Sequence, residues 1–147
     1  MVNTKLFLAA LIGYEYNCRI LHWKVKGLSF DGTHAIMQEY YEKLSDMIDQ
    51  VAELILMNPD EDCVPPSLLE AIQLLENSDR EFVLLDTKKN YTRQEVFSEV
   101  EKMFADLRDL ASAALPELSE DLKSVYDEFF YWLRVEGSYK IKQRLKA

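Results

Sequence analysis

The sequence predicts an all-α fold, a bundle of four long helices with a short helix in the long crossover between the second and the third. Apolar residues recur at spacings of three and four over long stretches, as on the buried face of a helix. Glycine and proline number only four each, which favours long uninterrupted elements. The 147 residues are enough for one sizeable core, so we expect a single domain over residues 1–147.

Each expected helix is delimited by capping or breaking signals. In the patterns Ser-x-x-Glu and Thr-x-x-Glu, a hydroxyl and a carboxylate each bond a free backbone N–H at the start of a helix. The expected helices are residues 3–25 (capped by Asn3 or Thr4, ended by Gly27), 31–57 (ended by Pro59), 67–76 (capped by Ser67 with Glu70), 92–115 (capped by Thr92 with Glu95, ended by Pro116) and 119–143 (capped by Ser119).

Composition argues against several classes of function. The net charge of −9 disfavours general binding to nucleic acid. No segment approaches the roughly 20 apolar residues that span a bilayer, so we expect no membrane partner and a cytoplasmic location. Cys18 and Cys63 lack metal-ligand spacing and are expected to be reduced thiols. No glycine-rich phosphate loop or nucleophile–histidine pattern supports a kinase, a nuclease or a hydrolase.

The chain carries a candidate set of four metal-binding side chains, which includes both of its histidines: His22, His34, Asp49 and Glu53. At about 100° per residue, His34, Asp49 and Glu53 share one face of the second expected helix. His34 and Asp49 are roughly 22 Å apart along its axis, too far for one ion. An antiparallel copy would bring one chain's His34 against the other's Asp49 and Glu53, which predicts two symmetric sites in a two-fold dimer. Such mixed ligands suit Fe(II), Zn(II) or Mn(II).

The same residues form a recognisable motif. His-Trp-x-Val-x-Gly-x-x-Phe-x-x-x-His runs from His22 to His34, and Asp-x-x-Ala-Glu follows from Asp49 to Glu53. This pattern resembles the Dps family of mini-ferritins. The resemblance implies a ferritin-like bundle that assembles from two-fold dimers into a homo-oligomeric, dodecameric shell. It also implies that the short helix 67–76 lies at the dimer interface.

Two positions depart from the family pattern. The family usually has a carboxylate four residues after the second histidine, where this chain has Gln38, and an arginine after Ala-Glu, where it has Leu54. Gln38 is a neutral oxygen donor and a weaker ligand than aspartate for a hard cation, so we expect one of two iron positions to be weakened. Glu39 faces away from His34, and Glu42 shares its face but lies roughly 12 Å further along the axis, which makes both poor substitutes.

The resemblance implies an iron-storing ferroxidase, a metal-ion oxidoreductase that oxidises Fe(II), with hydrogen peroxide as the preferred oxidant, and so protects against oxidative stress. It implies catalytic and ligand roles for His22, His34, Asp49 and Glu53, with Gln38 as a further ligand. Two alternatives stay open. One is a ferroxidase-impaired shell or structural protein that binds a single ion such as Zn²⁺, with metal binding weakened by Gln38 in place of a carboxylate. The other is a helical interaction module without a metal.

Three further features have functional and structural interpretations. Trp23 corresponds to an aromatic residue beside the iron centre in the family, although packing alone would explain it. Glu120, Asp121 and Asp127 would line an iron-attracting pore in a Dps-like shell, or complement a helix dipole. The basic segment 139–146 predicts DNA binding that is weak or absent.

Overall fold

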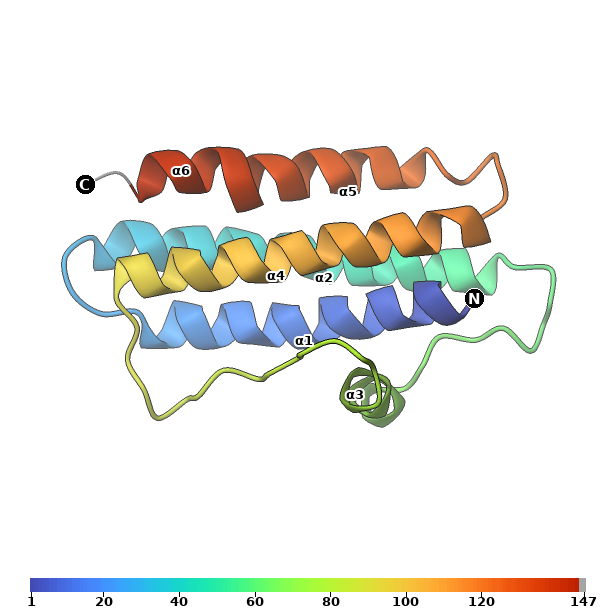
Figure 1. Cartoon of the computed structure of the whole chain (residues 1–147), viewed down its shortest axis with the longest axis horizontal. Coiled ribbons are helices and arrows are strands. Elements are labelled where there is room, and N and C mark those ends of the chain that lie inside the picture. Colours follow the sequence, from blue (N-terminus) through green and yellow to red (C-terminus); the bar gives the residue numbers. More distant parts are fainter. Residues whose placement is uncertain (146–147) are drawn as a thin grey trace.

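The structure is a computed structural model that describes residues 1–145; the end of the predicted domain, residues 146 and 147, and the last cation of the basic segment, Lys146, lie outside the described residues. The predicted bundle is confirmed. Its elements are α1 (Val2–Lys24), α2 (Phe30–Leu56), α3 (Leu68–Glu76), α4 (Arg93–Ala114), η1 (Leu115–Glu117), α5 (Val125–Arg134), η2 (Val135–Tyr139) and α6 (Lys140–Arg144). The segments α5, η2 and α6 together form the fourth long helix, and α3 crosses α1 on the outside of the bundle (Figure 1).

All four long helices contribute to one continuous apolar core. Phe7, Leu44, Leu107 and Phe129, one from each long helix, are completely buried. Burial of a side chain of this size contributes about 1.5–3 kcal/mol. α1 packs against α2, α4 and α3, so apolar residues surround most of its circumference. No helix among residues 1–145 is both long enough and apolar enough to cross a membrane.

Both predicted capping boxes are confirmed. The Ser67 hydroxyl accepts a hydrogen bond from the backbone N–H of Glu70 at 3.2 Å, and Thr92 accepts one from Glu95 at the same distance. Each glutamate in turn accepts from the backbone of its capping residue. These bonds join residues three positions apart, and α3 and α4 accordingly begin where the local pattern predicts.

The predicted cap of the first helix is wrong. α1 begins at Val2, and its N-cap residue makes no side-chain bond. The carboxylate of Glu117, at the end of η1, instead accepts from the backbone N–H groups of Asn3 at 3.0 Å and Thr4 at 2.7 Å, and from the Thr4 hydroxyl at 2.7 Å. An anion at this end satisfies free N–H groups and the helix dipole together. Glu117 is therefore a cap supplied by tertiary structure.

The predicted start of the fourth long helix is also wrong. We expect it at residue 119 with Ser119 as the cap, but α5 begins at Val125. The intervening chain forms tight turns, in which Leu122 N–H donates to the Ser119 carbonyl at 3.0 Å and Val125 N–H donates to the Leu122 carbonyl at 3.2 Å. Each of these bonds spans three residues rather than the four of an α-helix, so the chain here is wound too tightly to belong to α5.

The fourth long helix is also not a continuous α-helix, because the π-helical turn η2 interrupts it. A Cβ atom on Gly137 would lie 2.5 Å from the Cβ of Phe104 on α4, so only glycine allows this close approach. Next to it, Glu136 is buried, accepts a hydrogen bond from the Tyr40 phenol at 3.1 Å and pairs with two cationic side chains of α6. Tight packing and a satisfied buried charge thus accompany the wider turn.

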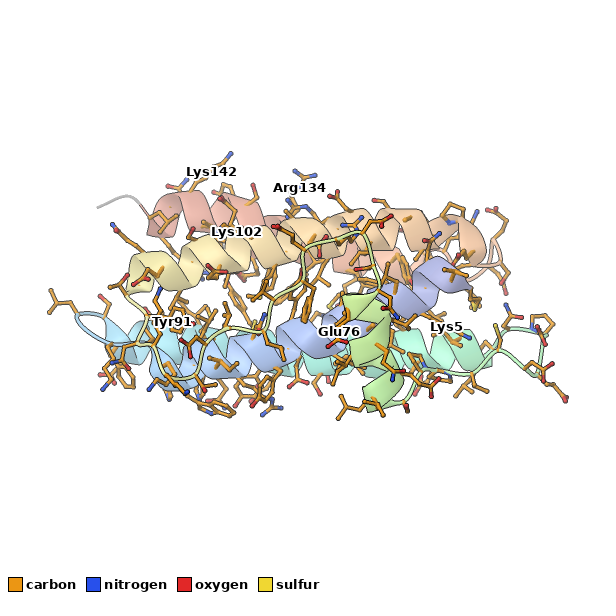
Figure 2. The ribbon with its side chains drawn as sticks, turned by 60° about the horizontal axis from the view of Figure 1, so that its bottom comes forward. Lys5, Glu76, Tyr91, Lys102, Arg134 and Lys142 are labelled. Atoms are coloured by element: carbon orange, nitrogen blue, oxygen red, sulfur yellow. The ribbon has the colours of Figure 1, made fainter. Side chains whose placement is uncertain are left out.

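The end of α1 is tied to the crossover by an isolated β-bridge. Tyr91 N–H donates to the Lys24 carbonyl at 2.9 Å, and Lys26 N–H donates to the Tyr91 carbonyl at 2.8 Å. Figure 2 shows Tyr91 at the end of the bundle where α1 connects to α2. Gly27 supports the sharp connection with a φ of +102°, a left-handed conformation that side chains disfavour. The bridge positions the last turn of α1.

Candidate metal centre

Two imidazole rings meet where α1 ends and α2 begins. The rings of His22 and His34 stack with centroids 3.6 Å apart and planes inclined by 15°. Phe30 stacks on His34 at 4.9 Å, and Tyr41 meets the His22 ring edge-on at 5.4 Å. These aromatic neighbours restrict both imidazoles to fixed planes.

Each of these imidazoles also bonds the backbone of the other histidine. Nδ1 of His22 lies 2.7 Å from the carbonyl oxygen of His34, and Nδ1 of His34 lies 2.7 Å from the carbonyl oxygen of His22. A carbonyl oxygen can only accept, so each Nδ1 carries the hydrogen and donates it. Nε2 of each neutral ring then keeps its lone pair, the form in which histidine binds a metal ion. The pair is therefore set in the metal-binding tautomer by the backbone alone.

Gln38 lies one turn after His34 on α2, on the exposed surface. Its side-chain N–H group donates a hydrogen bond of 3.0 Å to a carboxylate oxygen of Glu42, one turn further on. Glu39, the neighbour expected to face away from the site, is also exposed. The position at which the motif has a carboxylate is thus occupied by the amide of Gln38, which is hydrogen-bonded to the carboxylate of Glu42.

Asp49 and Glu53 lie on the exposed surface of the second half of α2. Four positions separate them, so they are neighbours on one face. Asp49 is fifteen positions beyond His34, about 22 Å along the helix axis. Within residues 1–145 of one chain, no three side chains of His, Cys, Asp or Glu gather closely enough to hold an ion. One chain thus brings its two histidines together and leaves the two carboxylates apart from them.

The surroundings of the histidines include residues to which the sequence analysis assigns no role. The guanidinium of Arg19 lies 4.2 Å from the centre of the Tyr41 ring, which itself contacts His22. Helical spacing is the signal that could have found Arg19, which precedes His22 by three positions on α1.

Trp23, the aromatic residue expected beside the metal centre, follows His22 directly in the sequence. Its side chain is 52 % exposed and packs edge-on against Tyr16, with ring centroids 6.0 Å apart.

The three acidic residues of the proposed pore are all exposed. Glu120 and Asp121 lie in the turns before α5, whereas Asp127 lies in its first turn, where an anion complements the helix dipole. Glu120 pairs with Lys123 at 2.6 Å. Glu117, an acidic neighbour in the sequence, is instead committed to the start of α1.

An apolar groove runs between α1 and α3. It is lined by residues that include Ile12 and Tyr16 from α1, Leu68 and Ile72 from α3, and Leu84 from the crossover. Leu68 is 64 % exposed and Ile72 is 38 % exposed. α3 therefore covers part of α1 and leaves apolar side chains exposed along the groove between the two helices.

No model of a known protein family matches the chain, but individual proteins are similar to it in sequence and in structure. A DNA protection during starvation protein from Helicobacter pylori (strain J99) is 33 % identical over 97 residues, which span 61 % of this chain and 62 % of the relative. Antigen TpF1 from Treponema pallidum has a similar structure, with a TM-score of 0.83, 20 % identity and coverage of 99 % of this chain and 90 % of that one.

A Dps protein from Bacillus brevis is also similar in structure, with a TM-score of 0.73, 22 % identity and coverage of 99 % of this chain and 93 % of that one. At such low identities the structural matches establish the fold. The predicted resemblance to the Dps mini-ferritins and the predicted ferritin-like bundle are both confirmed.

Proposed function

We propose that this chain, which is similar in sequence and fold to the Dps-family mini-ferritins, binds Fe(II) between two subunits, oxidises it and stores the ferric product. The observation that supports this best is the reciprocal bonding of His22 and His34, which leaves two Nε2 lone pairs on neighbouring rings. Imidazole nitrogen is a suitable ligand for Fe(II).

The proposed site combines two subunits. His22, His34 and Gln38 come from one chain, and Asp49 and Glu53 come from an antiparallel copy of α2. The two imidazoles bind the ion as neutral ligands, and the two carboxylates balance its positive charge. Backbone bonds hold the imidazoles in place, so the site needs little rearrangement when Fe(II) arrives.

Hydrogen peroxide is the proposed oxidant. Two Fe(II) ions supply one electron each, and with two protons these electrons reduce one peroxide molecule to two water molecules. Pairing the electrons in this way avoids release of hydroxyl radical. The exposed ring of Trp23, adjacent in sequence to His22, is proposed to absorb oxidising equivalents that escape the site.

The proposed assembly is a homo-oligomeric, dodecameric shell in the cytoplasm, built from two-fold dimers. The apolar groove beside α3 is a suitable contact surface for a second copy. Glu120, Asp121 and Asp127 are exposed, as residues of a pore that attracts Fe(II) must be. With a net charge of −9, the chain is expected to bind DNA weakly or not at all.

The test is anaerobic loading of the purified protein with Fe(II), followed by hydrogen peroxide, with ferric absorbance recorded over time. The control is the double variant His22→Ala/His34→Ala, after size-exclusion chromatography has shown that it assembles like the wild type. We expect rapid oxidation in the wild type and slow oxidation in the control. Equal rates in the two proteins would refute a ferroxidase centre at these histidines.

A second candidate is a ferroxidase-impaired shell that binds a single ion, with Zn²⁺ as one choice. It is favoured by Gln38, whose amide stands in the ligand position and carries no charge. Under this alternative, Gln38→Asp sharply raises the rate of iron oxidation. An unchanged rate would show that the residue at this position does not limit activity.

A further inference from the structure

We infer that Glu42 is a positioning residue of the proposed metal centre and that it acts through Gln38. The inference rests on the proposed function, because this role of Glu42 requires an ion that binds beside His34. It concerns the position at which the chain departs from the motif. The amide and the carboxylate together replace the one missing carboxylate.

The hydrogen bond between the two side chains determines how Gln38 is oriented. An ionised carboxylate only accepts, so it must be the NH₂ group of Gln38 that faces Glu42, at 3.0 Å. The carbonyl oxygen of the same amide is then directed away from Glu42 and remains free to accept. Gln38 follows His34 by one turn at a rotation of about 40°, so its side chain leaves α2 on the face that carries the histidine.

The same bond also makes Gln38 a better ligand. A hydrogen bond to a charged acceptor is roughly twice as strong as one between neutral groups, and it polarises the donor. Polarisation of the amide N–H by Glu42 increases the negative charge on the amide oxygen. Outer carboxylates raise the basicity of metal-bound histidines in this way. Gln38 thereby recovers part of the donor strength that its lack of charge removes.

Glu42 is available for this role because no cation neutralises it. Among residues 1–145, no lysine or arginine forms an ion pair with Glu42, whereas the adjacent Lys43 pairs with Glu128 at 2.7 Å. Glu42 is also roughly 12 Å beyond His34 along the axis, too far to share an ion with it directly. Its influence on the ion therefore passes through the amide of Gln38.

The experiment is a titration of the assembled, metal-free protein with Co(II), followed by visible absorbance, which reports ligand number and geometry without any oxidation. Glu42→Gln removes the charge but keeps the size, and Glu39→Gln is the matched control one residue from Gln38. We expect Glu42→Gln to weaken Co(II) binding about 10- to 100-fold, the usual effect of losing an outer partner, and Glu39→Gln to leave it unchanged. Equal affinities in the two variants would overturn the inference and identify an ordinary surface pair.

A double-mutant cycle tests whether the effect passes through Gln38. In the Gln38→Asp background the ligand carries its own charge and cannot donate to Glu42, so Glu42→Gln should no longer weaken Co(II) binding. An equal loss in the wild-type and Gln38→Asp backgrounds would contradict the proposed route. The shorter side chain of Gln38→Asn cannot make the same bond, so this variant should behave like Glu42→Gln; wild-type affinity would count against the inference.

The variant His22→Ala/His34→Ala separates this inference from the proposed function. If it binds Co(II) as tightly as the wild type, the histidines are not ligands and both ideas fail. If it loses Co(II) while Glu42→Gln binds like Glu39→Gln, the metal centre stands and only the role of Glu42 is refuted.

Discussion

Removal of the Glu117 carboxylate should destabilise the protein by an amount that the structure allows us to work out. Glu117 accepts two backbone bonds, from Asn3 and Thr4, and one from the Thr4 hydroxyl. A lost helix cap costs about 0.5–2 kcal/mol, and a lost anion at a helix N-terminus costs about 0.3–1 kcal/mol. Because the carboxylate is partly exposed and screened by water, we expect about 2 kcal/mol for Glu117→Ala and about 1 kcal/mol for Glu117→Gln.

The same carboxylate makes a defined contribution to the pH dependence of stability. Burial raises the pKa of Glu117, but the hydrogen bonds from Thr4 and Asn3 outweigh burial and leave the pKa below its usual value. The unfolded chain therefore binds this proton more readily than the folded one. The stabilisation is fully present above the unfolded pKa of about 4.3 and is lost as the pH falls through the folded pKa. The difference between the wild type and Glu117→Gln should accordingly shrink on acidification.

The assay is urea unfolding of the assembled protein followed by circular dichroism, at neutral pH and at a series of acidic values. Protein concentration is matched between variants, since assembly contributes to apparent stability. Glu120→Gln is the control, because this nearby carboxylate forms only a surface pair with Lys123. Equal stability of Glu117→Gln and Glu120→Gln at neutral pH would refute the assignment of Glu117 as the cap of α1. A stability difference between the wild type and Glu117→Gln that grows on acidification would refute it as well.

Two further predictions concern the π-helical turn. Gly137→Ala places a Cβ atom 2.5 Å from the Cβ of Phe104, which cannot swing aside, so the variant should lose about 1–3 kcal/mol of stability in thermal unfolding. Gly32→Ala is the control, because the added atom meets nothing within 4 Å, and it should not be destabilised in this way. Tyr40→Phe removes the hydroxyl that donates to buried Glu136 and should lower the free energy of unfolding in urea by about 1–2 kcal/mol. An unchanged free energy would show that this bond contributes nothing.

The fold could be predicted because its main signals are local. The boxes at Ser67 and Thr92 each join residues three positions apart, so the helix start is encoded within four residues. The apolar period along α2 is equally local and predicts which face enters the core. The motif singled out His22 and His34 in the same manner, since a short turn between two helices leaves few ways to arrange them.

Tertiary structure decided the features that join distant parts of the chain. Glu117 caps α1 across 113 positions, and no pattern around Asn3 or Thr4 indicates a cap from so far away. The π-helical turn depends on how closely Gly137 approaches Phe104 on another helix. Its cause lies in the packing of α4 against the fourth long helix.

The candidate metal centre shows the same division. Sequence by itself determined that one histidine lies on each side of the turn between α1 and α2. It also determined that Asp49 and Glu53 share a helix face with His34. Only the tertiary structure decided the tautomer, because each Nδ1 bonds a carbonyl twelve positions away. The bond between Gln38 and Glu42, by contrast, joins side chains one turn apart on the surface of α2, so helical spacing alone brings them together. Spacing determines which side chains can meet, and packing determines which atoms of those side chains remain free to bind.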